Sequence, residues 1–190
     1  GVTVEITPTD PGATAPAPIA AAPDIAPSKL LESRDYVWTT PENLGPPVNT
    51  VRSEMNPTLT ADELCLVCVS QPEGNLSELV ECVRPSIDAP FGPPKRLTGA
   101  TKEKEPCLSA DGLTLIYASE VGSFGKNDLW IRRRKSRADV WSSPVHLLQE
   151  INGPDDDRSP NLSLDGLTLV FSSDRPGGMG KFDIWSARRK

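Results

Sequence analysis

The sequence has few of the residues that enzymes use for chemistry. Among 190 residues there is one histidine, His146, and only 5% are aromatic. There is no Gly-x-Ser-x-Gly motif, no Walker-type loop, and no run that approaches the roughly 18 apolar residues of a membrane span. Because no set of nucleophile, base and orienting group is visible, we expect no catalytic residues, no cofactor and no enzyme activity. We also expect no membrane insertion.

Positive charge is also scarce. The formal net charge is −6 at pH 7, from 20 Lys and Arg against 26 Asp and Glu. Nucleic acids and anionic membranes attract cationic surfaces. The composition therefore argues against both as partners.

Cysteine is present at four positions, and two of them have the Cys-x-x-Cys spacing of redox and zinc sites. The flanking residues, however, indicate a buried strand, in which residues three apart point to opposite faces. A zinc site would also need ligands from a chain with one histidine. We therefore expect buried core thiols and no metal site, the four positions being Cys65, Cys68, Cys82 and Cys107.

The first 30 residues differ from the rest of the chain. Between Thr7 and Pro27 the sequence is almost entirely Pro, Ala, Thr, Ile, Gly and Asp. Such a composition cannot bury enough apolar surface to offset its ordering entropy. We expect residues 1–30 to be a linker. The chain starts at Gly1 without Met, which favours a processed N-terminus or a piece of a longer protein.

The remaining chain repeats one pattern, Pro-x-x-Ser-x-Asp-Gly followed by a β-rich run and a Gly-rich loop. The pattern is complete in Pro160–Trp185, clear in Pro106–Trp130 and degenerate from Pro57. The opening prolines are 49 and 54 residues apart, a period that indicates propeller blades or solenoids.

A second element follows the first and keeps an aromatic residue, a proline and a leucine in register. Its three copies are Trp38-x-x-Pro41-x-x-Leu44, Phe91-x-x-Pro94-x-x-Leu97 and Trp141-x-x-Pro144-x-x-Leu147.

The two elements together predict four strands for each repeat. In the middle repeat these are Leu108–Ser109, Leu113–Ser119, Asp128–Arg133 and Val140–Leu147, with an Asp-Gly hairpin turn and no amphipathic helix. We therefore predict an all-β fold of β-propeller blades, each with four antiparallel strands. The repeats are placed at 56–97, 105–147 and 159–190, with an orphan outer strand at 33–44, inside a propeller region of residues 31–190.

These repeats resemble the TolB-type, WD-like propeller repeats of bacteria. The match extends from about Ser33 to Lys190 and is strongest between Pro160 and Trp185. The resemblance implies a bacterial propeller protein and favours the periplasm or cell envelope.

The last repeat ends before its fourth strand, and the first tryptophan element lacks the three strands before it. Three blades are too few to close a ring. We therefore expect an incomplete part of a larger propeller. Oligomeric completion, an open stack, and ring closure by the N-terminal strand are the alternatives.

Most of the repeated polar residues have structural explanations. In Ser-x-Asp-Gly, the aspartate would cap the turn and the glycine would take the left-handed conformation. Asp128 and Asp183 resemble aspartates that bond to neighbouring loop backbone. The tryptophans would pack between blades, and the basic run Arg132–Arg137 would face solvent at a sheet edge.

Two loops remain as candidates for binding, because loops on a rigid scaffold often carry recognition. One is Gly153–Arg158, predicted to be solvated, although three adjacent carboxylates could in principle hold a hard cation. The other is Ser173–Lys181. The candidate binding residues are Asp155, Asp156, Asp157, Arg158, Asp174, Arg175 and Lys181.

The sequence thus favours a non-enzymatic binding or scaffold module that engages a protein, peptide or glycan. The alternative is a regulatory or sensory segment of a larger enzyme, such as a signalling kinase or hydrolase, joined through the Pro/Ala linker.

Overall fold

The computed structural model describes residues 39–190 except 73, 75, 100 and 190, and this part of the chain is all-β. The expected linker, residues 1–30, lies outside the described residues. Contacts divide the chain into two units, Gly1–Pro41 and Glu42–Lys190, and the strands of the described residues lie in the second unit. Within the described residues, no helix is long and apolar enough to cross a membrane.

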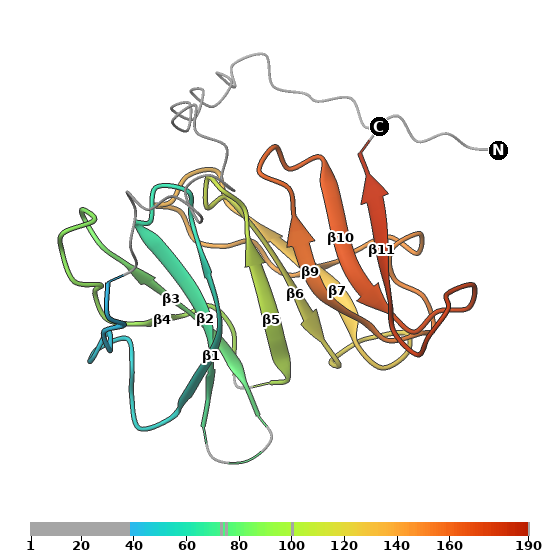
Figure 1. Cartoon of the computed structure of the whole chain (residues 1–190), viewed down its shortest axis with the longest axis horizontal. Helices are drawn as coiled ribbons and strands as arrows, with labels where there is room; N and C mark the ends of the chain where they lie inside the picture. Colours follow the sequence, from blue (N-terminus) through green and yellow to red (C-terminus); the bar gives the residue numbers. More distant parts are fainter. Residues whose placement is uncertain (1–38, 73, 75, 100, 190) are drawn as a thin grey trace. The chain divides into compact units, whose positions relative to one another are not determined.

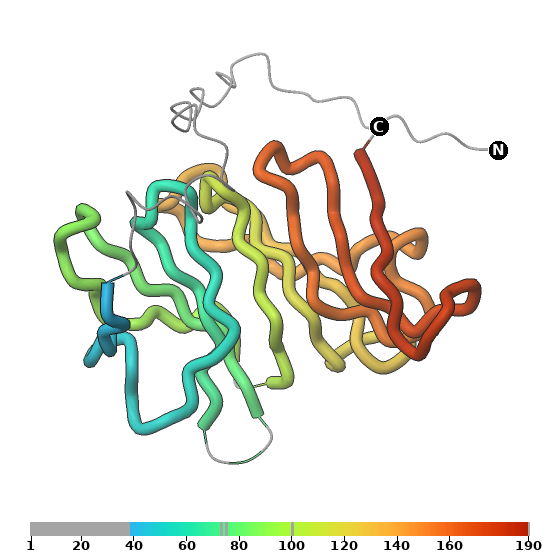
Figure 2. Tube along the Cα trace, viewed as in Figure 1, coloured from blue at the N-terminus to red at the C-terminus, as the bar shows by residue number. Residues whose placement is uncertain are grey.

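The strands form three antiparallel sheets that follow one another along the chain (Figures 1 and 2). The first contains β1 (Ser53–Leu59), β2 (Cys65–Gln71), β3 (Glu78–Val83) and β4 (Lys95–Arg96). The second contains β5 (Glu103–Leu108), β6 (Thr114–Ser119), β7 (Asp128–Arg133) and β8 (Val145–His146). The third contains β9 (Asp157–Leu162), β10 (Thr168–Ser173) and β11 (Asp183–Arg188).

The register of the sheets confirms the repeat. Tyr117 pairs with Trp130 in the second sheet and Phe171 pairs with Trp185 in the third. Each first strand also has an irregularity at the residue before its proline, where a non-glycine residue has positive φ. These residues are Asn56 (50°), Glu105 (54°) and Ser159 (49°). Proline has no N–H to give to the ladder, so it fits at such an irregularity.

The predicted fourth strand, Val140–Leu147, is much shorter in the structure. Only Val145 and His146 form β8, because Pro144 cannot donate a backbone hydrogen bond. The fourth segment nevertheless lies along β7, since Ser142 N donates to Arg133 O at 2.8 Å and Leu147 N donates to Leu129 O at 3.1 Å. Of the predicted orphan strand 33–44, residues 33–38 lie outside the described residues, and residues 39–44 form no strand.

Neighbouring sheets share apolar cores because alternate residues of a strand point to opposite faces. Val67 and Val69 of the first sheet pack with Leu115 and Tyr117 of the second. The other face of the second sheet packs against the third. That second core contains Ile116, Ala118, Leu129, Ile131, Leu169 and Phe171. Trp130 and Trp141 flank the first core and Trp185 the second, which confirms the predicted role of these three tryptophans.

The Asp-Gly turns also have the predicted structure. Asp111 Oδ1 accepts from Leu113 N at 2.9 Å and Asp165 Oδ1 from Leu167 N at 3.0 Å. Gly112 has φ 74° and Gly166 φ 69°, in the left-handed region. These aspartates are therefore turn residues.

The cysteines are buried free thiols, as predicted. Burial raises the pKa of Cys65 to about 12, and the nearby Glu81 carboxylate adds to the effect. Within the described residues, no group of three or more His, Cys, Asp or Glu side chains is arranged to hold a metal ion.

The prediction for the basic run was wrong at Arg134. Its guanidinium is buried between the first two sheets, where it pairs with the buried carboxylate of Glu81 at 2.9 Å and lies 4.2 Å from the ring centre of Trp141. Arg137 is half-buried and bonds to Asp111 O at 2.8 Å. The sequence could not show that a neighbouring sheet presents a carboxylate to this run.

Candidate functional site

Three loops lie together at one end of the second and third sheets, and we call this surface the loop face. The loops are 120–127, 153–156 and 174–182. Gly125 lies directly on Pro154, since a Cβ at Gly125 would be 2.2 Å from Pro154 O. Lys126 Nζ reaches Asp174 at 2.7 Å, and Asp174 in turn accepts from Asp156 N at 2.7 Å. The three loops are therefore held as one surface.

Beneath the loop face lies a network of buried carboxylates. Asp156 accepts from Asn127 Nδ2 at 2.7 Å and from Arg158 Nε at 2.6 Å. Asp157 is paired with Arg175 NH2 at 2.6 Å and accepts from Gly153 N at 3.1 Å. The paired charges and hydrogen bonds offset the desolvation cost of burying these carboxylates.

The predicted binding residues therefore divide into two groups. Asp156 and Asp157 were expected in a solvated loop, but their side chains are buried and engaged. Arg158, Asp174 and Arg175 are half-buried partners in the same network, and Asp155 is half-buried beside them. Lys181 is exposed. The structure thus brings five of the seven into the network; Asp155 lies beside it without a side-chain hydrogen bond among the described residues, and Lys181 is exposed.

The sequence did not identify the residues that the second sheet contributes to this site, Lys126 and Asn127. Asn127 links the loop after β6 to Asp156 in the loop before β9, 29 residues away, and Lys126 links it to Asp174 in the loop after β10, 48 residues away. Their only sequence signal is their position before Asp128, the predicted strand-entry aspartate. That aspartate accepts from Phe124 N at 2.7 Å, and Asp183 accepts from Met179 N at 2.9 Å, which confirms the prediction for both.

The network predicts how acid affects stability. Burial opposes ionisation of Asp156, but hydrogen bonds from Arg158 and Asn127 outweigh it and lower the pKa below the ordinary 3.8. A carboxyl with a lowered folded pKa stabilises the protein above its unfolded pKa, and the contribution is lost as the pH falls toward the folded pKa. We expect D156N to reduce the free energy of unfolding by about 1–2 kcal/mol at neutral pH.

Denaturant titrations across acid pH measure this effect. The difference between wild type and D156N should narrow as the pH falls below about 4. D155N is the matched control, because Asp155 has no side-chain hydrogen bond among the described residues, and its stability should follow wild type. A D156N difference that stayed constant with pH would contradict the assignment.

Apolar side chains stand out from the loop face. Met179 is 101% exposed and Phe124 63% exposed, and Val121 and Phe182 are also exposed. The Arg158 guanidinium lies 5.4 Å from the ring centre of Phe182. The face therefore offers apolar contacts on loops that are held rigidly from below.

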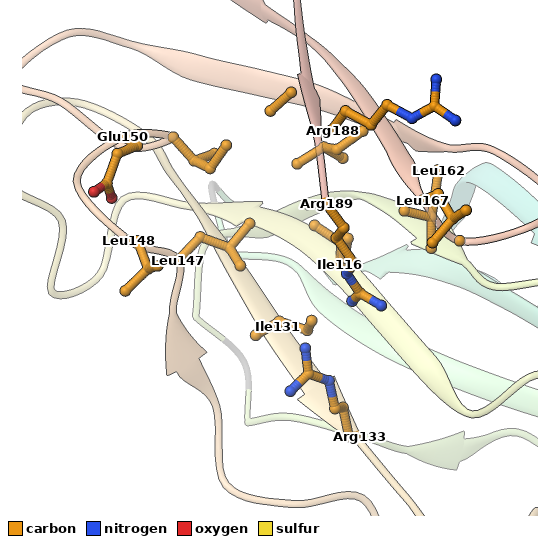
Figure 3. A pocket seen from close by; sticks show the side chains of 14 residues that line it. Ile116, Ile131, Arg133, Leu147, Leu148, Glu150, Leu162, Leu167, Arg188 and Arg189 are labelled. Carbon is orange, nitrogen blue, oxygen red and sulfur yellow. The ribbon is translucent and has the colours of Figure 1, made fainter. Parts of the chain in front are cut away.

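A separate cleft lies between the second and third sheets, and we call it the inter-sheet cleft. Its volume is about 520 Å³, and its walls are mostly aliphatic. Figure 3 shows the lining side chains, with arginines at three positions. They come from β6, β7, the segment after β8, β9, the β9–β10 turn, β10, and β11 with the residue after it. Five of them matter below: Ile116, Leu147, Leu162, Leu169 and Arg189.

No protein-family model and no curated protein matches the chain. Among solved structures, TolB from Acinetobacter baumannii aligns with a TM-score of 0.52 and 16% identity, over 72% of this chain and 30% of that one. The chain has a TolB-like β-propeller fold. The predicted fold class and resemblance are thus confirmed.

Two further structures match this TolB-like chain with lower scores. A TolB structure from Agrobacterium tumefaciens aligns with a TM-score of 0.43 and 17% identity, over 73% of this chain and 59% of that one. An acylaminoacyl peptidase aligns with a TM-score of 0.40 and 16% identity, over 64% and 17%. The chain therefore spans less than two thirds of the length of each of these proteins.

Proposed function

We propose that this chain is a non-enzymatic binding module whose loop face engages an extended segment of a partner protein. The observation that carries the proposal is the exposed apolar set on the loop face, led by Met179 and Phe124. Methionine and aromatic residues are enriched at protein interfaces and often dominate their binding energy. Exposed apolar groups that cluster on one face favour an interaction site over chance exposure.

The charges of the loop face support the same proposal. Lys181 and Lys126 are exposed at the rim, while Asp156 and Asp157 are paired and buried beneath it. A partner segment with apolar side chains and a nearby carboxylate would therefore meet complementary groups. The carboxylates that the sequence pointed to would then hold the loops in place rather than contact the partner.

Rigidity of the loops supports binding without a large entropic cost. Each of the three loops is fastened to another by hydrogen bonds or by the close approach of Gly125 to Pro154. A surface that is already ordered loses less conformational freedom on binding. A glycan ligand and a regulatory role within a larger enzyme remain predictions from the sequence.

The test is selection of ligands on the immobilised chain from a random-peptide display library and a glycan array. We expect peptides that contain apolar residues and an acidic residue to be selected. Titration calorimetry with one such peptide should show at least a tenfold weaker Kd, about 1.4 kcal/mol, for the M179A/F124A variant.

The control is L164A. Leu164 is also an exposed apolar residue, but it lies in the β9–β10 turn and not on the loop face. Its affinity should stay within about twofold of wild type. Equal losses for M179A/F124A and L164A, or selection of glycans alone, would overturn the proposal.

A further inference from the structure

In each of the first two sheets, the segment with the aromatic, proline and leucine residues makes the same two backbone hydrogen bonds to the third strand. In both, the residue after the aromatic donates to the end of the third strand: Gly92 N to Val83 O at 2.8 Å, and Ser142 N to Arg133 O at 2.8 Å. The leucine then donates further back, Leu97 N to Leu79 O at 2.9 Å and Leu147 N to Leu129 O at 3.1 Å. The motif with an aromatic, a proline and a leucine is therefore the sequence of an outer strand.

Among the described residues, the third sheet has no such segment. In the described part of the chain, β11 pairs only with β10. Ile184 occupies the position of Leu79 and Leu129, which are both 0% exposed, yet it is 74% exposed. An unpaired strand edge beside an exposed apolar side chain is a template for strand addition.

The inter-sheet cleft lies where the aromatic side chain of an outer segment beside β11 would pack, as Trp141 packs between the first and second sheets. Between the first and second sheets, Arg134 stacks on Trp141, and Val67, Leu108 and Leu115 form the core beside it. The residues at the same repeat positions between the second and third sheets are Arg189, Ile116, Leu162 and Leu169, and all four line the cleft. The cleft therefore has the lining of a tryptophan site.

A second, independent correspondence between the repeats is an asparagine that follows the leucine of this segment. Asn152 is fully buried, where its side-chain amide accepts from Leu129 N at 2.8 Å and donates to Leu129 O at 2.9 Å. Asn49 follows Leu44 at the distance at which Asn152 follows Leu147. The backbone repeats too, since Asn49 N donates to Gly45 O at 2.9 Å and Asn152 N to Leu148 O at 2.9 Å.

Asn49, however, makes no hydrogen bond to the backbone of a third strand among the described residues. Its side chain is half-buried and bonds only to Asn43 Oδ1, at 2.9 Å, among the described residues. Val48 beside it packs on Leu66, Cys82 and Phe91, on the face of the first sheet that is turned away from the second. Figure 1 shows this segment beside the first sheet and β11 at the other end of the stack.

While Val48 packs on the first sheet, Leu44 cannot reach β11 of the same chain. Leu44 lies four positions before Val48, a separation that spans at most about 14 Å. Sheets pack about 10 Å apart, so the third sheet lies about 20 Å from the first. A second copy can present the segment to β11 without moving Val48.

We propose that residues Trp38–Asn49 of a second copy add to β11, with Trp38 in the inter-sheet cleft and Asn49 bonded to the backbone of Ile184. The register follows from β8: Glu42 would lie opposite Ser186, and its carboxylate diagonal to Arg188. Two copies joined head to tail would bring together six sheets. That number lies within the about four to eight blades at which propellers close.

The test is sedimentation equilibrium of the full 190-residue chain. We expect a species of twice the 20.5 kDa mass of one chain. N49A should weaken the dimer Kd at least about tenfold, and W38A at least about a hundredfold, while each variant keeps the circular dichroism of wild type. N161A, which changes an exposed asparagine of β9, should stay within about twofold. A chain that stays monomeric, or an open series of larger species, would overturn the proposal.

Cross-linking shows whether the segment beside β11 comes from a second copy or from the same chain. E42C and S186C are prepared separately, mixed and oxidised. We expect a disulfide-linked heterodimer, and we expect none when S186C is mixed with N161C. A disulfide that forms within single chains of the E42C/S186C double variant, with no heterodimer from the mixture, would show that the segment acts in its own chain and would overturn the proposal.

Discussion

We expect L129A to lower the free energy of unfolding by about 2–5 kcal/mol, the range for a fully buried leucine. Leu129 is 0% exposed, packs in the core between the second and third sheets, and is bonded through its backbone to Asn152 and Leu147. Removing its side chain leaves a cavity where two sheets meet. Since a whole domain is stable by only about 5–15 kcal/mol, the transition should move to much lower denaturant concentration.

The matched control is I184A at the same position of the third sheet. Ile184 is 74% exposed, so its truncation should change the stability of a single copy by no more than about 0.5 kcal/mol. Urea titrations at concentrations where the chain sediments as single copies measure both variants. Similar losses for L129A and I184A would contradict this account, because they would show that Ile184 is buried in a single copy as Leu129 is.

We expect R134M to cost about 3–5 kcal/mol, because it leaves the Glu81 carboxylate buried without its partner. The Arg134 side chain is 1% exposed and that of Glu81 5%, with 2.9 Å between them. Arg134 also donates to Gly112 O in the β5–β6 turn at 2.8 Å, so the substitution removes a bond within the second sheet as well as the link to Glu81 of the first sheet. Thermal or urea unfolding measures the loss.

Replacing both partners should restore most of that stability. An apolar pair of similar volume is often as stable as a buried ion pair. The chain provides a precedent, since Ile131 occupies in the second sheet the position of Glu81 in the first. E81I/R134M should therefore be more stable than R134M. A double variant that lost as much stability as R134M or more would contradict this view of the pair.

Much of the fold could be predicted because its signals are local. An Asp-Gly turn and the alternation of a strand depend on neighbouring residues, so Asp128–Arg133 was placed with the bounds that β7 has. The fourth strand was overestimated, because a tryptophan and a leucine in register do not show that Pro144 limits the ladder to Val145 and His146.

The candidate site was predicted less well, because it depends on partners distant in sequence. Adjacent aspartates in a loop suggest solvent exposure unless something neutralises them. Asp156 meets Asn127 and Asp157 meets Arg175, from 29 residues before and 18 residues after. The inter-sheet cleft has no local sequence signal at all. Its resemblance to a tryptophan site lies in the fold, where Arg189 occupies the position of Arg134, whose tryptophan partner is present.

The most direct test of the proposed function is hydrogen–deuterium exchange with and without a selected peptide. The account predicts slower exchange on peptide binding in residues 120–127, 153–158 and 174–182, and unchanged exchange in the Asp-Gly turns at Gly112 and Gly166. Protection confined to those turns, or protection of β11 and residues 42–49 without the loops, would place the binding site elsewhere and contradict the loop face as the functional surface.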